Sequence, residues 1–276
     1  MAHILIIEGD TPEQLRINVQ QGVTSNAQYY QNALLSCRPN TVTQLLQPYH
    51  PDFSLQDLTF DNVDGIVFTG STVNWSVDAP EAKPLRDTME KALSSGKPVL
   101  GSCNGMQLGA VVLGGRVHSS PNGLELGLAK KIQLTTEGQK HPIHAGRNTE
   151  FTCPCIHRDE VSELPSGALL TATNAHSPVQ AFTYENNGVS FWGMQYHPEI
   201  SATEIADIVE ADGLFASGAS LARDLRLLES ESKADASARL GVDAKDLVPH
   251  TRMLELTNWL ALIAHRSSLS GFTKGR

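Results

Sequence analysis

The chain of 276 residues is long enough for one large domain, or for one domain with an appendage. Hydrophobic residues make up 40% of it and charged residues 18%, the balance of a globular protein with an ample core. The net charge of −9 argues against a surface that binds nucleic acid or anionic membranes. The apolar run Ile4–Ile7 is too short for a signal peptide or a membrane span. Four cysteines without framework spacing indicate a reducing compartment, so we expect a cytoplasmic protein.

The first hundred residues alternate between short apolar runs and helical patterns. The predicted elements, in chain order, are a strand at His3–Ile7, a helix from Pro12 capped by Thr11, a helix at Asn26–Cys37, strands at Val42–Leu46 and Gly65–Gly70, and a helix at Glu81–Ser95. This alternation predicts βαβ units and an α/β fold with a doubly wound, mostly parallel sheet. In such a fold the active site lies at the carboxyl ends of the strands.

The stretch Lys97–Gly114 places a cysteine at a strand-to-helix corner. Pro98-Val-Leu is typical of a buried strand and Met106–Leu113 of a helix, with Cys103 at the joint between them. A thiol at such a corner is lifted out of the sheet, and the N–H groups of the new helix favour its thiolate form. Taken alone, Cys103 is as well explained as a small buried hydrophobe, so a nucleophile needs a base nearby.

The expected base lies in the segment Tyr196-His197-Pro198-Glu199. Pro198 holds the residue before it in extended geometry, and residues two apart in an extended segment project to the same side. We therefore expect the Glu199 carboxylate to bind one nitrogen of His197 and to leave the other nitrogen for the sulfur. Cys103, His197 and Glu199 would then be nucleophile, base and orienting group.

These two segments resemble a known family. Gly101-x-Cys103-x-Gly105-x-Gln107 and Tyr196-His197-Pro-Glu199 are similar to the motifs of the class I, or triad, glutamine amidotransferases, among them the glutaminase domain of GMP synthetases. The resemblance implies a flavodoxin-like fold and makes Cys103, His197 and Glu199 the catalytic triad. It also implies hydrolysis of the glutamine side-chain amide to glutamate and ammonia through a γ-glutamyl thioester.

The turn Gly70-Ser71-Thr72 ends a predicted strand and should lie beside Cys103 at the same sheet edge. We expect the main-chain N–H groups of Gly70, Ser71 and Asn104 to form an oxyanion hole. The family usually has Gly-Gly-Pro at this turn, so the departure affects the rigidity of the loop and leaves its main-chain donors in place. The alternative interpretation is an ordinary βα turn.

The resemblance also implies four substrate-binding residues. They are Gln107, one turn after the nucleophile, Glu125 in Gly123-Leu-Glu-Leu-Gly127, and the pair His157 and Asp159 before a Leu-Pro-x-Gly turn. Small residues commonly flank that histidine in the family, whereas this chain has Ile156 and Arg158. This change affects how the α-carboxylate and α-amine of glutamine are held, so the resemblance alone does not establish standard glutamine specificity.

Cys153-Pro-Cys155-x-His157 offers an alternative, a metal site. The spacing is unlike that of zinc sites and a fourth ligand is missing, and the resemblance places the segment on a substrate loop, so we expect no metal. His141 and His144 lie in a turn-rich segment expected at the surface. The sequence contains no glycine-rich phosphate loop, so we expect no nucleotide or other cofactor.

Short β-type stretches follow Arg116 and predict an antiparallel extension of the sheet, with a hairpin turn at Asn186-Asn-Gly188. The predicted strands of this extension are Lys130–Thr135, Ala168–Ala172, Val179–Tyr184 and Val189–Gln195. Helical patterns return after Glu199, in Ala202–Phe215, Ala219–Leu228 and Asp246–His265, with an exposed connection at 229–236. We divide the chain into a catalytic domain, 1–216, and a helical C-terminal extension, 217–276. The extension is expected to pack on the domain; the alternative is a docking surface, or a dimer surface that would give a homo-oligomer.

Three functions remain open. The first is a glutaminase that passes ammonia to a separate synthase subunit, because no synthase domain is fused to this chain. The second is a hydrolase of other γ-glutamyl amides or peptides, which uses the same triad without channelling. The third, a non-catalytic regulatory module, is disfavoured by the intact Cys103, His197 and Glu199.

Overall fold

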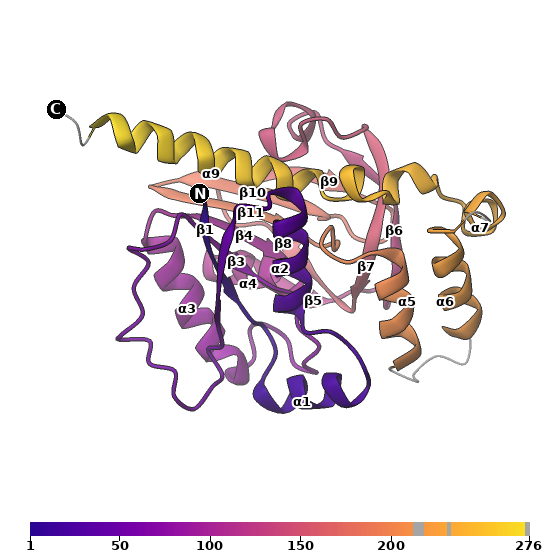
Figure 1. The fold of residues 1–276 in the computed structure, drawn as a ribbon, viewed down its shortest axis with the longest axis horizontal. Coiled ribbons are helices and arrows are strands. Elements are labelled where there is room, and N and C mark those ends of the chain that lie inside the picture. Colours follow the sequence, from indigo (N-terminus) through magenta and orange to yellow (C-terminus); the bar gives the residue numbers. More distant parts are fainter. Residues whose placement is uncertain (212–217, 231–232, 274–276) are drawn as a thin grey trace.

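The computed structural model describes residues 1–211, 218–230 and 233–273 (Figure 1). Its strands are β1 (His3–Ile7), β2 (Val42–Leu46), β3 (Gly65–Phe68), β4 (Pro98–Ser102), β5 (Arg116–Ser119), β6 (Glu125–Leu134), β7 (Glu150–His157), β8 (Asp159–Glu163), β9 (Leu169–Thr173), β10 (Ala181–Asn186) and β11 (Val189–Met194). Its α-helices are α1 (Pro12–Gln20), α2 (Asn26–Cys37), α3 (Lys83–Ser94), α4 (Asn104–Val112), α5 (Ala202–Ala211), α6 (Gly218–Leu227), α7 (Lys233–Leu240), α8 (Pro249–Arg252) and α9 (Leu254–Thr273). Short 3₁₀ helices are η1 (Pro80–Ala82), η2 (Gly138–Lys140), η3 (Pro142–His144) and η4 (Ala244–Leu247).

Nine strands form one sheet in the order β2-β1-β3-β4-β11-β10-β9-β6-β7, and β5 pairs with β8 apart from it. The first five strands of that order are parallel neighbours, whereas the pairs from β11 to β7 are antiparallel. The mostly parallel α/β sheet with an antiparallel extension is confirmed. One strand differs from the prediction: β11, expected within the extension, also pairs in parallel with β4 and joins the two parts of the sheet. Because β1, β3, β4 and β11 are parallel, their carboxyl ends meet at one edge, where an active site is expected.

Helices cover both faces of the parallel strands. α2 and α9 lie over one face of the sheet (Figure 1). Their apolar side chains form one core with those of alternate strand residues. α3 and α4 pack on the other face and form a second core. A third core lies between α5, α6 and α7 beside β6. The alternation of helices and strands along the first hundred residues therefore gives the doubly wound arrangement that the sequence predicts.

The structure contains three strands beyond the predicted ones, β5, β7 and β8. The segment that we expected to be a loop, Cys153–His157, lies at the end of β7, and Asp159 begins β8. Pro154 is compatible with a strand here because β7 is the last strand of the sheet. Ile143 and His144 are buried, so the expectation of a surface segment was wrong there.

The C-terminal helices pack on the rest of the chain. The apolar side chains of α9, among them Leu256, Trp259 and Ile263, are buried in the core beside β1 and β3. Their burial supports the interpretation that the extension packs on the domain, because these residues are not exposed for docking. Oligomerisation stays a prediction. The expected exposed connection is wrong in part, because α7 begins at Lys233 and buries Ala236.

Two predicted boundaries, the domain division at 216/217 and the helix end at Phe215, lie outside the described residues. Within the described ranges, no helix is both long and apolar enough to cross a membrane.

Candidate active site

Cys103 lies at the corner between β4 and α4 and has an unusual backbone conformation. Its φ of 48° and ψ of −109° are seldom adopted by residues with a side chain. The corner depends on its glycines: a Cβ at Gly105 would lie 2.3 Å from the carbonyl oxygen of Phe68, and one at Gly101 would lie 2.6 Å from the main chain of Gly105. This is the strained strand-turn-helix geometry of a nucleophile elbow, which the sequence pattern predicts.

His197 follows β11 at the same sheet edge, and its ring is oriented by a carboxylate. Its Nδ1 lies 2.7 Å from Oε1 of Glu199, and that oxygen also accepts a hydrogen bond of 3.2 Å from Ser102. Burial alone would lower the pKa of His197, but the Glu199 carboxylate and the neighbouring Cys103 sulfur raise it to about 10. Its Nε2 is buried and makes no hydrogen bond within the part of the chain that the structure describes. Glu199 thus orients the ring through Nδ1, and Nε2 remains available for proton transfer.

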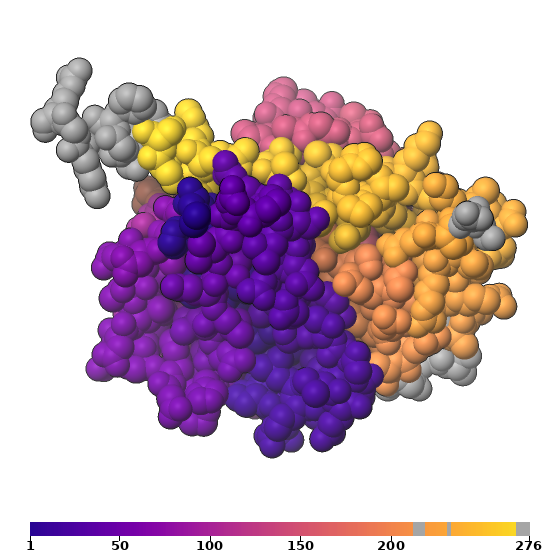
Figure 2. All heavy atoms as spheres, in the orientation of Figure 1, coloured from indigo at the N-terminus to yellow at the C-terminus, as the bar shows by residue number. Residues whose placement is uncertain are grey.

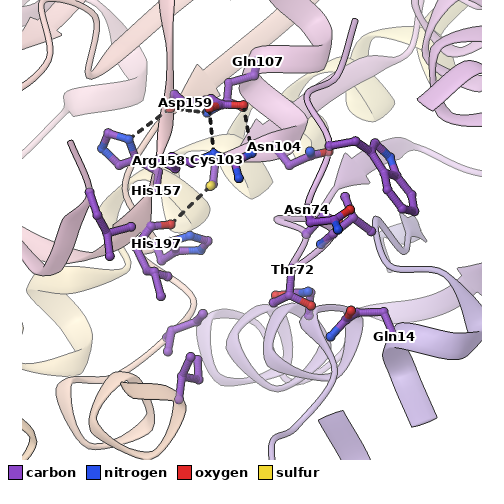
Figure 3. Close-up of a pocket in the computed structure, with 18 residues that line it drawn as sticks. Gln14, Thr72, Asn74, Cys103, Asn104, Gln107, His157, Arg158, Asp159 and His197 are labelled. Atoms are coloured by element: carbon purple, nitrogen blue, oxygen red, sulfur yellow. Dashed lines mark hydrogen bonds and ion pairs between the residues drawn. The ribbon is translucent and has the colours of Figure 1, made fainter. Parts of the chain in front are cut away.

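A cavity of about 430 Å³ opens beside these groups and is large enough for a small organic substrate. Cys103 and His197 both line it. Figure 3 shows them on one side of the cavity and Gln14, Thr72 and Asn74 on the other. A molecule in this cavity can therefore contact the sulfur and the imidazole at the same time.

The three residues expected to form the oxyanion hole lie beside Cys103 and His197 at the cavity. Ser71 and Asn104 line the cavity, and a Cβ at Gly70 would lie only 2.9 Å from Cε1 of His197. No hydrogen bond to a described residue uses the main-chain N–H of Ser71. The N–H of Asn104 has no partner within its helix either, since Asn104 is the first residue of α4. Both donors are therefore free to bind a negatively charged oxygen.

Asp10 holds the turn that carries these donors, although no sequence motif marks it. Its buried carboxylate accepts a hydrogen bond of 2.6 Å from the main-chain N–H of Thr72 and one of 2.9 Å from the hydroxyl of Ser71. The side-chain amides of Asn18 and Asn26 donate to its other oxygen at 3.1 and 3.0 Å. These bonds give the Gly-Ser-Thr turn a fixed geometry where the family usually has a proline.

Three of the four residues expected to bind substrate line the cavity, namely Gln107, His157 and Asp159. The Gln107 amide donates a hydrogen bond of 2.6 Å to the carbonyl oxygen of Asp159, so it supports the cavity wall. Burial raises the pKa of Asp159, but hydrogen bonds from Arg158 and Ser119 hold it below its ordinary value. Asp159 is therefore a carboxylate at neutral pH.

Glu125, the fourth, lies behind His157 and is not among the residues that line the cavity. Its carboxylate is 2.8 Å from Nε2 of His157 and accepts hydrogen bonds from the amides of Gln180 and Asn174 at 2.8 and 2.7 Å. Burial raises the pKa of Glu125, but His157 and the amides of Asn174 and Gln180 together outweigh this and hold the pKa below its ordinary value. The structure thus places Glu125 where it orients His157 from behind the cavity wall.

Of the alternative metal ligands, Cys155 and His157 come together with Glu125, and Cys153 lies outside this group. Nε2 of His157 is bonded to Glu125, and the thiol of Cys155 donates to the carbonyl oxygen of the same residue at 3.4 Å. Burial raises the pKa of both cysteines well above the ordinary value. Because metals bind thiolates, this chemistry does not favour a zinc site.

Two comparisons of sequence place the chain among known proteins. The family model of the class-I glutamine amidotransferases matches residues 24–215. A γ-glutamyl-L-1-hydroxyisopropylamide hydrolase of Pseudomonas sp. is 31% identical over 277 aligned residues, which cover 93% of this chain and 91% of that protein. The GMP synthase of Thermomicrobium roseum is 33% identical over 189 residues, which cover 68% of this chain but only 33% of the synthase.

Solved structures show the same fold. A glutamine amidotransferase of Thermotoga maritima is similar with a TM-score of 0.63 at 18% identity, over 95% of this chain and 97% of that one. A glutamine amidotransferase of Methylobacillus flagellatus is similar with a TM-score of 0.54 at 20% identity, over 94% of this chain and 90% of that one. With a family model over most of its length and a relative that matches it nearly end to end, the chain belongs to the class-I glutamine amidotransferase family.

Proposed function

We propose that this protein hydrolyses γ-glutamyl amides to glutamate and ammonia or an amine, with Cys103 as nucleophile, His197 as base and Glu199 as orienting group. One observation carries the proposal: the Cys103 sulfur and the His197 imidazole line one cavity, and Glu199 binds the far side of that imidazole. The Pseudomonas sp. hydrolase supports this substrate class, since it matches this chain over 91% of its own length.

In the first half-reaction the Cys103 thiolate attacks the carbonyl carbon of the γ-amide, and a C–S bond forms. The oxygen that gains the negative charge accepts hydrogen bonds from the N–H groups of Ser71 and Asn104, with Gly70 completing the turn around it. The C–N bond then breaks, the leaving nitrogen takes a proton from the His197 imidazolium, and a γ-glutamyl thioester remains. The raised pKa of His197 keeps it protonated for this step.

In the second half-reaction water replaces the departed amine. The now neutral His197 accepts a proton from the water, whose oxygen attacks the thioester carbon. The C–S bond breaks, glutamate leaves, and the proton on His197 again pairs with the Cys103 thiolate. Glu199 acts in both halves, because its hydrogen bond to Nδ1 holds the ring in one tautomer and one orientation.

Two charged side chains in the cavity are complementary to the α-carboxylate and the α-ammonium group of a γ-glutamyl substrate. Among the described residues that line the cavity, Arg158 is the one permanent cation and Asp159 the one carboxylate. They lie side by side, with Arg158 Nε 3.1 Å from Asp159 Oδ1. An α-carboxylate can bind the guanidinium and an α-ammonium the carboxylate, and His157, held by Glu125, forms the wall beside them.

A second candidate function is supply of ammonia from glutamine to a separate synthase subunit. It is favoured by the GMP synthase relatives, which are about a third identical over two thirds of this chain. The two functions use the same triad and differ in the leaving group and in the need for a partner. All four cysteines are free thiols, which suits the cytoplasm for either function.

A substrate panel tests the proposal. Purified protein would be assayed for glutamate release from glutamine and from γ-glutamyl amides with N-alkyl and hydroxyalkyl substituents. We expect a higher kcat/KM for a substituted amide than for glutamine. Preference for glutamine would favour ammonia supply. Turnover of no amide, even after addition of the organism's own synthase subunits, would refute both functions and leave the regulatory module.

A further inference from the structure

The C-terminal segment bonds to the chain on both sides of His197. The hydroxyl of Tyr196, the residue before it, donates a hydrogen bond of 2.9 Å to Oε1 of Glu255 at the start of α9. The carbonyl oxygen of Pro198, the residue after it, accepts a hydrogen bond from the guanidinium of Arg252 at the end of α8. Tyr196 and Glu255 are completely buried and Arg252 nearly so, hence both bonds are shielded from water.

Glu255 is held as an anion in this buried place. Nε of Arg147 donates to its Oε1 at 3.1 Å, another nitrogen of Arg147 binds Oε2, and Nδ1 of His144 lies 3.3 Å from Oε1. Burial raises the pKa of Glu255, but Arg147 and His144 more than offset this and lower it to about 2. Arg147 also donates to the carbonyl oxygen of Arg252 at 3.0 Å. Arg147 thereby binds both the Glu255 carboxylate and the main chain of Arg252.

The helix that carries Glu255 is itself anchored to the sheet. Trp259 and Ile263 are buried, and they pack so closely on β3 that a Cβ at Gly65 would lie within 3 Å of both side chains. In Figure 2 the C-terminal segment (yellow) lies directly against the N-terminal part of the chain (purple). Residues 252–255 therefore have a rigid support, and they lie outside the region 24–215 that the family model matches.

We propose that Arg252 and Glu255 form a clamp that positions His197 for catalysis, so that the C-terminal segment is part of the catalytic apparatus. The inference rests on the proposed function of His197 as base. Without the clamp, two main-chain hydrogen bonds to other described residues still hold His197: its N–H donates to the carbonyl oxygen of Pro154 at 2.8 Å, and its carbonyl oxygen accepts from the N–H of Ile200 at 3.4 Å. A displacement of about 1 Å in such a group costs up to about a hundredfold in rate.

Two variants remove the clamp one arm at a time. Tyr196→Phe deletes only a hydroxyl, and Arg252→Met deletes the cation while it keeps most of the side-chain volume. Arg252→Lys restores a donor and serves as the conservative rescue. Asn258→Ala is the matched control. Asn258 of α9 donates to the carbonyl oxygens of Ile143 and Ala145 at 2.9 and 3.0 Å, and among the described residues it forms no hydrogen bond with 196–198.

Two readouts are needed, one with substrate and one without. With a γ-glutamyl amide, we expect Tyr196→Phe and Arg252→Met to lower kcat about tenfold with KM nearly unchanged. Without substrate, the rate at which iodoacetamide alkylates Cys103, followed on its tryptic peptide, should fall about tenfold at pH 7, because a displaced imidazolium no longer favours the thiolate. Arg252→Lys should recover part of both losses, and Asn258→Ala should keep both values.

Wild-type kcat and wild-type alkylation of Cys103 in both Tyr196→Phe and Arg252→Met would overturn the clamp. Equal losses in Asn258→Ala would overturn it too, since they would show a general effect of loosening α9. If the wild type cleaves no γ-glutamyl amide but the alkylation rates follow the expected order, the proposed function fails and the clamp stands.

Discussion

Gly70→Ala places one methyl group against the proposed base and changes little else. The new Cβ would lie 2.9 Å from Cε1 of His197, whereas its next neighbours, Asn26 Oδ1 and Cys103 Cβ, are at ordinary distances of 3.7 and 3.8 Å. The backbone at Gly70 is not in the left-handed region, so alanine causes no conformational strain there. The substitution therefore creates a steric clash with the His197 imidazole and with no other of the nearest neighbours.

The displacement of the imidazole ring can be worked out from the distance between the new Cβ and Cε1. Carbon atoms in contact are about 3.5–4.0 Å apart, so the ring must retreat by roughly 0.6–1 Å. Its bond of 2.7 Å to Glu199 opposes the movement or is broken by it. A displacement of that size costs about a hundredfold in kcat, which is about 2.7 kcal/mol of transition-state stabilisation.

The assay is steady-state hydrolysis of the best γ-glutamyl amide, together with thermal unfolding of the same preparations. We expect kcat of Gly70→Ala to fall about a hundredfold while KM changes little and the protein remains folded, since overpacking of this kind costs about 1–3 kcal/mol of stability. A folded Gly70→Ala protein with kcat within twofold of the wild type would refute the role of His197 as a precisely placed base.

Three further predictions concern charged groups around the site. Asp10→Ala should lower kcat about tenfold and reduce the free energy of unfolding by about 1–3 kcal/mol, because the Thr72 N–H and the amides of Asn18 and Asn26 lose their acceptor; urea unfolding and kinetics check this. Burial and the nearby Asp10 raise the pKa of Glu8 to about 7, so between pH 4.5 and 7 the folded chain binds more protons than the unfolded chain and stability falls as pH rises. The free energy of unfolding of Glu8→Gln, relative to that of the wild type, should therefore rise by about 2–3 kcal/mol from pH 5 to pH 8. The same difference between variant and wild type at both pH values would contradict the raised pKa of Glu8. Arg158→Ala should raise KM about tenfold or more with a smaller effect on kcat, whereas unchanged KM would exclude binding of the α-carboxylate by this residue.

The sequence predicts the part of the site that depends on local geometry and on parallel strands. The strand-to-helix corner at Cys103 follows from an apolar run, two glycines and a helical pattern, all within twenty residues. The meeting of Gly70 and Cys103 follows from a general property of parallel sheets, whose strands end at one edge. The strand before His197 was predicted in the antiparallel extension, whereas β11 pairs in parallel with β4 and so brings His197 to the same edge. The contact between the His197 ring and the Glu199 carboxylate follows from the proline between them, which holds His197 in extended geometry.

The groups that support the site were missed because their partners come from distant parts of the chain. Asp10 stands shortly after the end of β1 at Ile7, at the predicted edge, yet its role depends on Thr72 and Asn26, which only the fold brings to it. Glu125 was expected at the substrate, and its place behind His157 depends on the pairing of β6 with β7. The pattern of α9 predicts a buried face, but no pattern shows that Glu255 reaches the residue beside His197.

Identification of the acylated residue tests the central claim most directly. Protein in steady-state turnover of a γ-glutamyl amide would be quenched in acid, digested and examined by peptide mass spectrometry. We expect the γ-glutamyl group on Cys103 and on none of Cys37, Cys153 and Cys155, and we expect Cys103→Ala to release no glutamate. A γ-glutamyl group on another residue, or undiminished turnover by Cys103→Ala, would contradict the assignment of Cys103 as the nucleophile.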